Sequence, residues 1–176
     1  MMRRRTFLAT GLAATTAACG RRRSYWRFFS NDEARTVEAL CAQIIPDDRD
    51  PGAVQAGVIH YIDTQLTGFY RPLQKTYRQG IAAIDRKSAK VCGKPFADLP
   101  TSSQVALLQR IEKDPDLKPF FDLLVSHTMQ GFYGDPRHGG NRERVSWKML
   151  GVAYPPLRGR LRYDLTAPDK GERPWG

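Results

Sequence analysis

Apolar residues recur at helical spacing along most of this chain, and this periodicity is the strongest constraint on its fold. In residues 30–44 they lie three or four positions apart, as on the buried face of an amphipathic helix. Ser30 and Glu33 have the spacing of a capping box at the start of that helix, and Pro46 stops it. No stretch shows the sustained alternation of apolar and polar residues expected of a strand. The sequence therefore predicts an all-α fold.

Further helices are predicted by the same spacing, each bounded by a proline, a glycine or a capping residue. They cover residues 53–70, 72–91, 101–111 and 117–129, and a short helix around Trp147 covers residues 143–150. We expect a bundle of about five helices, followed by an irregular C-terminal segment rich in glycine and proline. The length of 176 residues suits one such domain, which we place at residues 30–176.

Two of these helices carry specific predictions about their ends. The apolar stripe of the second helix starts at Val54 and ends at Phe69, so both side chains are expected in the core. Thr101 is expected to cap the fourth helix, with Gln104 as its capping-box partner.

Residues 1–19 are typical of an export signal, with a basic start and a mildly apolar run. That run is shorter than the about 20 residues that a membrane-spanning helix needs. The pair Arg4 and Arg5, followed by Phe7 and Leu8, resembles the twin-arginine signal, which exports folded proteins. A general secretory signal with an arginine-rich start is the alternative. Both interpretations predict export to the periplasm.

Small residues before Cys19 resemble a lipobox, in which this cysteine becomes the lipid-bearing first residue. Thr16 occupies the place where such a motif usually has an aliphatic residue, so cleavage at the small residues and retention as an uncleaved anchor are alternatives. Residues 20–29 form a basic linker in which the arginines at 21–23 could add attraction to anionic lipid, about 1 kcal/mol per charge. These features predict attachment to a membrane.

The formal net charge of +10 does not indicate nucleic-acid binding. Six arginines, at positions 3–5 and 21–23, flank the apolar run of the leader and supply most of the excess. The rest of the chain shows no clustered basic stripe. We therefore expect no nucleic-acid partner.

The spacing of reactive residues does not indicate a catalytic, metal or cofactor site on this chain. The three histidines are His60, His127 and His138, and none lies three or four positions from another histidine or a cysteine, as metal ligands on a helix would. No Gly-x-Ser-x-Gly or Cys-x-x-Cys-His motif occurs. Cys41 falls on the apolar face of the first helix, where a buried free thiol is expected, although export would permit a disulfide with Cys92.

A glycine-rich stretch over residues 131–141 is predicted to form a structured loop. It follows a helix rather than a strand and lacks the Lys-Ser/Thr ending of a phosphate-binding loop. Its glycines allow turns with positive φ and close approach of another surface. The nearby Phe132, Tyr133 and Trp147 are either core residues or anchors of an interface.

Three stretches of the chain resemble the gluconate 2-dehydrogenase subunit 3 family. The first is the twin-arginine-like leader, and the other two lie in the predicted domain. The second stretch contains Ile44-Ile45-Pro46-Asp47, Pro51-Gly52-Ala53, Ala56-Gly57-Val58 and Ile62-Asp63. The third contains Gly131-Phe132-Tyr133-Gly134-Asp135-Pro136, then Gly139-Gly140-Asn141, Trp147 and Gly151.

This resemblance implies a small, non-catalytic subunit that holds no cofactor itself. Its implied partner is a large flavoprotein of the glucose–methanol–choline oxidoreductase type, which carries FAD, and often a multihaem cytochrome c, which carries haem c. The leader of the small subunit would carry the folded, flavin-loaded partner across the membrane by co-translocation. The residues expected to bind the partner are Phe132, Tyr133, Gly134, Asp135, Gly139, Gly140, Asn141 and Trp147.

Two alternatives belong to other classes of protein. In one, the chain is a free-standing periplasmic lipoprotein or binding module, and the glycine-rich loop lines a small-molecule pocket. In the other, the chain itself is an enzyme. Dehydrogenase activity of the isolated chain would support this alternative, and we expect none.

Overall fold

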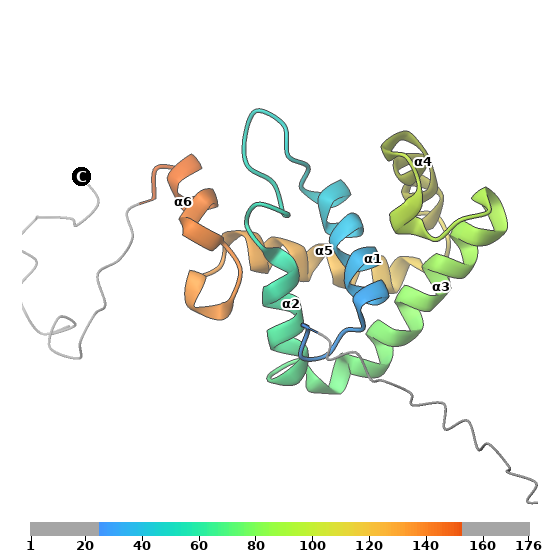
Figure 1. Cartoon of the computed structure of the whole chain (residues 1–176), viewed down its shortest axis with the longest axis horizontal. Coiled ribbons are helices and arrows are strands. Elements are labelled where there is room, and N and C mark those ends of the chain that lie inside the picture. The colour runs from blue at the N-terminus through green and yellow to red at the C-terminus, as the bar shows by residue number, and fades with distance from the viewer. Residues whose placement is uncertain (1–24, 153–176) are drawn as a thin grey trace, which may run out of the picture.

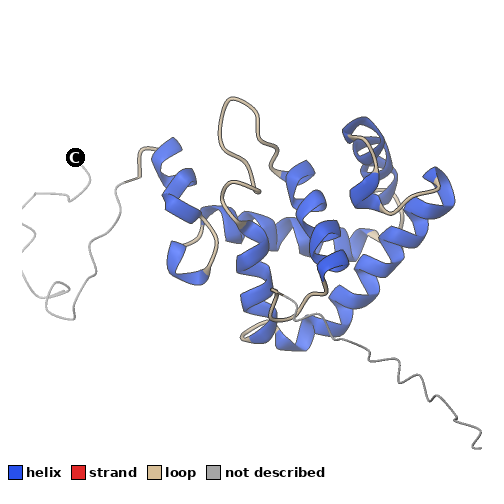
Figure 2. Ribbon diagram, viewed as in Figure 1, coloured by secondary structure: helices blue, strands red, loops and turns tan. Residues whose placement is uncertain are grey.

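Helices form all of the regular secondary structure in the computed structural model, which describes residues 25–152 (Figure 2). The α-helices are α1 (Asn31–Ile44), α2 (Val58–Thr67), α3 (Gln74–Cys92), α4 (Thr101–Ile111), α5 (Lys118–Tyr133) and α6 (Val145–Met149). Short 3₁₀ turns connect them: η1 (Arg71–Leu73), η2 (Phe96–Asp98), η3 (Pro136–His138) and η4 (Arg142–Arg144). The prediction of an all-α bundle is confirmed. The leader and the expected irregular segment beyond residue 152 lie outside the described residues.

Helix α5 crosses the molecule behind α1 and α2, while α4 and α6 lie at opposite ends of the bundle (Figure 1). The core lies where α1, α2 and α5 meet. It includes Leu40 from α1, Ile62 from α2 and Leu124 from α5, all fully buried. Burial of apolar side chains where helices cross is the main favourable contribution to such a bundle.

The first helix has the start that its sequence predicts. Ser30 Oγ accepts a hydrogen bond from the backbone N–H of Glu33 at 3.3 Å, and Glu33 Oε2 accepts one from the N–H of Ser30 at 2.8 Å. Val37 and Cys41 lie on its buried face. The capping box and the apolar spacing, both local signals, therefore define α1.

Helix α2 begins five residues later than predicted and ends at Thr67. Gly57 precedes it with a φ of +65°, in the left-handed region that interrupts a right-handed helix. Upstream, the N–H of Ala53 donates to the carbonyl of Ile45 at 2.8 Å, which holds the chain in a turn rather than a helix. Val54 and Phe69 are both exposed, so their predicted places in the core are wrong.

Helix α4 begins at Thr101 itself, so the prediction that Thr101 caps this helix is wrong. Pro100 is the cap residue, and no side-chain hydrogen bond closes this end of the helix. Gln104 instead donates to the carbonyl of Phe96 at 3.0 Å and accepts from Gln43 of α1 at 2.7 Å. Its amide therefore ties α4 to the rest of the bundle.

Helix α5 continues four residues beyond its predicted end, so Gly131, Phe132 and Tyr133 are helical rather than part of a loop. A Cβ at Gly131 would lie 3.0 Å from the ring of Tyr61 and 3.1 Å from Val58. The missing side chain lets α5 pack closely on α2. This contact stabilises the last turn of α5, although glycine has a low helix propensity.

Candidate functional site

The segment after α5 folds back so closely that its backbone touches the backbone of α5. A Cβ added at Gly140 would overlap the carbonyl oxygen of Gly131, in the last turn of the helix. On the neighbouring side, a Cβ at Gly139 would lie 3.3 Å from the carbonyl oxygen of His60 in α2. The loop is therefore seated on both α5 and α2, and its glycines serve contacts within the chain.

Asn141 holds the two ends of this loop together. It is fully buried with a φ of +43°, and its Nδ2 donates to the carbonyl of Gly134 at 3.0 Å. Its Oδ1 accepts from the N–H of Ser146 at 3.1 Å. Ser146 Oγ in turn donates to the carbonyl of Phe132 at 2.6 Å, which satisfies one of the unpaired carbonyls at the end of α5.

The aromatic residues of the site divide between the core and the surface. Phe132 is buried and belongs to the hydrophobic core. The neighbouring Tyr133 is exposed, and its ring meets that of Phe132 edge to face at 4.8 Å. Trp147 is half-buried, and its Nε1 donates to the carbonyl of Tyr133 at 2.7 Å, which fixes α6 against the end of α5.

The carboxylate of Asp135 is bonded to Arg137 within the loop. This carboxylate accepts from the backbone N–H of Arg137 at 3.0 Å and pairs with the guanidinium at 2.8 Å. These bonds from Arg137 hold the pKa of Asp135 below its usual range, so the side chain is a carboxylate at neutral pH. It caps η3 and keeps the shape of the turn.

An exposed apolar tip beyond the loop was not predicted from the sequence. Met149, Leu150 and Val152 are all exposed at the end of α6, beside the half-buried Trp147. The N–H of Val152 donates to the carbonyl of Trp147 at 2.8 Å, which keeps the tip folded against α6. The signal in the sequence was a group of apolar residues in the last turn of the predicted helix 143–150 and just after it. We call Tyr133, Trp147 and this tip, together with the loop 134–141, the C-terminal unit.

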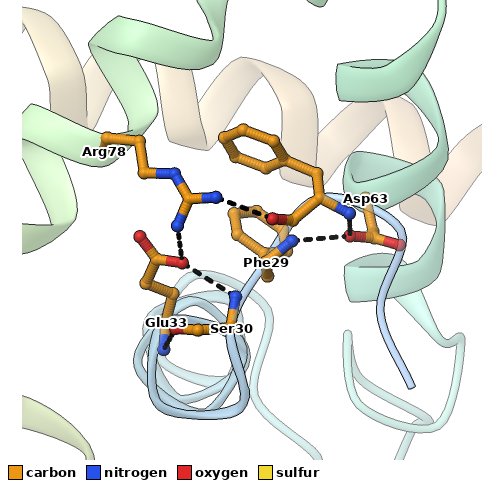
Figure 3. Close-up of polar contacts among 6 residues, drawn as sticks. Phe29, Ser30, Glu33, Asp63 and Arg78 are labelled. Atoms are coloured by element: carbon orange, nitrogen blue, oxygen red, sulfur yellow. Dashed lines mark hydrogen bonds and ion pairs between the residues drawn. The ribbon is translucent and has the colours of Figure 1, made fainter. Parts of the chain in front are cut away.

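A second cluster fastens the segment that follows the leader. Asp63 of α2 is only 4% exposed, and its carboxylate accepts from three consecutive backbone N–H groups, those of residues 27, 28 and 29, at 2.8, 2.9 and 3.1 Å. Arg78 of α3 donates to the carbonyl of Phe28 at 2.9 Å and pairs with Glu33 (Figure 3). Its guanidinium also lies 4.5 Å from the centre of the Phe28 ring.

We call residues 25–29 the leader junction. Its contacts with α2 and α3 were not predicted from the sequence. Asp63 appeared only as part of a family motif. A single carboxylate within the apolar run of α2 was the available signal, because a buried charge requires partners.

A buried polar cluster lies between α3 and α5. Tyr77 Oη lies 2.7 Å from His127 Nδ1, and Tyr70 stacks on the imidazole at 4.1 Å between ring centres. Burial lowers the pKa of His127, so the neutral ring is favoured. Gln130 Oε1 accepts from the hydroxyls of Tyr61 and Tyr70. Tyr77 and His127 are buried, whereas Tyr70 is half-buried and Gln130 is exposed at the edge of the cluster. The hydrogen bonds of the cluster join helices to one another.

Within residues 25–152 no group of three or more His, Cys, Asp or Glu side chains is placed to hold a metal ion. Cys41 is a buried free thiol, as predicted, and Cys92 is free and exposed. Burial raises the pKa of Cys41 to about 12, so it is not a nucleophile at neutral pH. None of the helices in the described part has the length and hydrophobicity to cross a bilayer.

The predicted export signal, Arg4, Arg5, Phe7 and Leu8, lies outside the described residues, and so does Cys19. A surface pocket of about 320 Å³ lies between α1, α4 and α5. Its apolar floor includes Leu108, Phe121 and Val125, and no residue of the C-terminal unit lines it. This pocket is therefore separate from the glycine-rich loop.

The described residues form an all-α domain in which the leader junction and the C-terminal unit are both fastened to α2. The sequence model of the family described as gluconate 2-dehydrogenase subunit 3 matches residues 31–154, which include all six α-helices and the loop. The chain belongs to this family. The family name denotes a subunit of a dehydrogenase complex. No curated protein and no solved structure matches the chain.

Proposed function

We propose that this chain is the non-catalytic small subunit of a flavin-dependent dehydrogenase that oxidises gluconate or a similar polyol. It binds and stabilises a large subunit of the glucose–methanol–choline type, which carries FAD, and escorts it into the periplasm. A multihaem cytochrome c would complete the complex as electron acceptor. The observation that carries this proposal is the family match over residues 31–154.

The partner surface in this proposal is the exposed part of the C-terminal unit. Tyr133 and Gly139 are exposed, and Asp135 and Trp147 are partly exposed beside them. Gly140 and Asn141 of this unit and the neighbouring Phe132 are buried, and their contacts within the chain give this surface a fixed shape. A preformed surface supports the proposal, since less conformational entropy is lost on binding. An aromatic residue at its centre is a common interface anchor.

The export step in this proposal uses the paired Arg4 and Arg5 of the leader. FAD binds to a folded flavoprotein, so a route that accepts folded cargo suits the partner. The leader junction supports this step, because residues 27–29 are hydrogen-bonded to α2 of a folded domain. Attachment of the mature complex to the membrane would follow from lipidation of Cys19 or from retention of the leader.

Purification of the tagged chain from membranes in mild detergent tests the complex. We expect a large flavoprotein with FAD absorbance to co-purify. Tyr133→Ala should reduce its recovery, whereas Val91→Ala, at an exposed apolar position on α3, should not. Recovery of a flavin-free monomer alone would contradict the proposal and favour a free-standing lipoprotein or binding module.

Replacement of Arg4 and Arg5 together by lysine tests the escort role. We expect the large subunit to remain in the cytoplasm, because the twin-arginine route requires the paired arginines. Arg22→Lys, which keeps the charge outside the motif, is the control and should leave export unchanged. Normal arrival of the flavoprotein in the periplasm with both arginines replaced would rule out the escort role.

A further inference from the structure

One stretch of the chain beside the leader junction lacks acidic residues. Residues 64–84, from the middle of α2 into α3, contain no Asp or Glu in 21 positions. The same stretch contains Arg71, Lys75 and Arg78. Arg78 pairs with Glu33, and no ion pair joins Arg71 or Lys75 to an acidic side chain among the described residues. Two cations of this stretch therefore face solvent without compensation.

The leader junction and this stretch also expose aromatic rings. Phe69 is 82% exposed and Tyr25 is 80% exposed, the two largest values among the described large hydrophobic residues. The ring of Phe69 meets that of Tyr70 edge to face at 5.3 Å between ring centres. The ring of Tyr25 meets those of Trp26 at 5.3 Å and His60 at 5.9 Å. Exposed aromatic rings beside arginine and lysine are typical of surfaces that lie at a membrane–water interface.

Contacts within the chain bring these residues to one end. The junction is hydrogen-bonded to Asp63 in α2 and to Arg78 in α3. Gln74 Nε2 donates to the carbonyl of Leu66 at 2.8 Å, which folds the start of α3 against the end of α2. Figure 1 shows the junction beside the lower end of α2 and the first turns of α3. We call the exposed residues of this region, Tyr25, Arg27, Phe69, Arg71 and Lys75, the leader end.

We propose that the leader end rests on the surface of an anionic lipid bilayer. The arginines at 21–23 support this occupant, because this basic block ends only two residues before Tyr25 in the sequence. The exposed cations and the leader block together match the negative surface of the membrane that the leader enters. The proposal rests on the proposed function for the export leader alone and does not require the flavoprotein.

The carboxylates near the leader end leave its positive charge largely in place. Asp63 is buried beneath three backbone N–H groups, and Glu33 is paired with Arg78. Asp32, in the first turn of α1, is exposed, and the described structure shows no ion pair for it. The three positive charges of Arg27, Arg71 and Lys75 therefore exceed the one negative charge of the exposed Asp32.

Co-sedimentation of the full chain with lipid vesicles tests the proposal. On vesicles that contain phosphatidylglycerol, Arg71→Gln should lower the partition coefficient about fivefold. Phe69→Ser should lower it about tenfold, because a large apolar side chain no longer leaves water. The controls are Lys148→Gln and Leu150→Ser, at exposed positions on and after α6, and should have no effect. Vesicles of phosphatidylcholine alone should bind all variants weakly.

Two results would overturn the proposal. One is an equal loss of vesicle binding in the variants of the leader end and in the control variants at Lys148 and Leu150. The other is unchanged binding of Phe69→Ser, since the leader would then bind without the folded domain. A fluorophore gives an independent measurement. In a chain with Cys19→Ser and Cys92→Ser, a dye on Phe69→Cys should shift to the blue on vesicles, and a dye on Leu150→Cys should not. Buried Cys41 would remain unlabelled. Failure to co-purify a flavoprotein would disprove the proposed function but leave these results unchanged.

Discussion

The carboxylate of Asp63 is the single side chain that joins three consecutive backbone N–H groups of the leader junction to the bundle. Hydrogen bonds to a charged acceptor contribute more to stability than neutral ones. Asp63→Asn removes the charge but keeps the shape. We expect a loss of about 2 kcal/mol in the free energy of unfolding, measured by chemical denaturation.

Hydrogen exchange at the amides of residues 27–29 provides the second readout and should become faster in Asp63→Asn. The control is Asp122→Asn, which removes an exposed carboxylate paired with Lys118 and should be nearly neutral. Unchanged exchange at these amides would show that Asp63 does not hold the junction.

Gly140 is a position where the smallest side chain would be too large. Gly140→Ala places a Cβ against the carbonyl oxygen of Gly131, and a backbone atom cannot rotate away as a side chain can. We expect a destabilisation of about 1–3 kcal/mol, seen as a lower Tm. At Gly68 the nearest atom would be at an ordinary 3.6 Å, so Gly68→Ala is the control. Equal effects of the two substitutions would contradict the packing argument.

His127 should make stability depend on pH. Burial lowers the pKa of its imidazole, whereas the unfolded chain has a pKa of about 6.5 and takes up the proton first. The free energy of unfolding should therefore be complete above this value and fall as the pH drops below it. His127→Gln should flatten this part of the profile.

The control for this pH profile is His138→Gln, at an exposed position in η3. The pKa of His60 is also lowered, by burial first and by Arg142 second, so some slope should remain in the His127 variant. Parallel profiles for His127→Gln and the unmodified chain would show that this residue does not contribute.

At the scale of the helices, local signals predicted the structure well where they acted alone. Helix α1 has its capping box and apolar spacing within one segment, so its bounds followed from the sequence. The start of α2 and the end of α5 did not. Gly57 adopts a positive φ, and Gly131 remains helical because Val58 and Tyr61 pack against it. Neither the φ of a glycine nor a contact between two helices can be recognised from the spacing of apolar residues.

The same error in α5 explains what could be predicted of the site. The loop and its aromatic neighbours were located from sequence, but the choice between core and surface was left open. Because Phe132 and Tyr133 belong to the last turn of a helix, successive side chains point about 100° apart. One is therefore buried and the other exposed. Asp63 was missed as the junction residue because its partners are backbone groups, which any sequence could supply.

The crossing of α3 over α5 depends on one small residue. A Cβ at Gly80 would overlap the ring of Phe120, so Gly80→Ala should destabilise the protein by about 1–3 kcal/mol. Phe120→Leu makes room at the same place. We expect the double variant to lose less stability than the sum of the two single variants, measured as a double-mutant cycle. Additive losses would show that the two residues do not meet at this crossing.

At the scale of the whole molecule, the thiols report how the bundle opens. Cys41 is buried with its Sγ 3.3 Å from Thr128 Oγ1, whereas Cys92 is exposed. In a Cys19→Ser chain, a thiol reagent should modify Cys92 at once and Cys41 only at the rate of unfolding. Low concentrations of denaturant should accelerate the modification of Cys41 alone. Equal rates for both thiols in native buffer would contradict the described core.

The fastening of the N-terminal segment also determines how a mechanical load enters the protein. Traction on residues 1–24 would be transmitted to the carboxylate of Asp63, in the middle of α2, before it reached the first turn of α1. The turn that leads into α2 is also bonded to the far segment, since the N–H of Arg142 donates to the carbonyl of Ala56 at 2.9 Å. A force applied through the leader would therefore act on α2 and, through the turn before it, on the segment at Arg142. Helix α4 makes none of these contacts and would not carry the force directly.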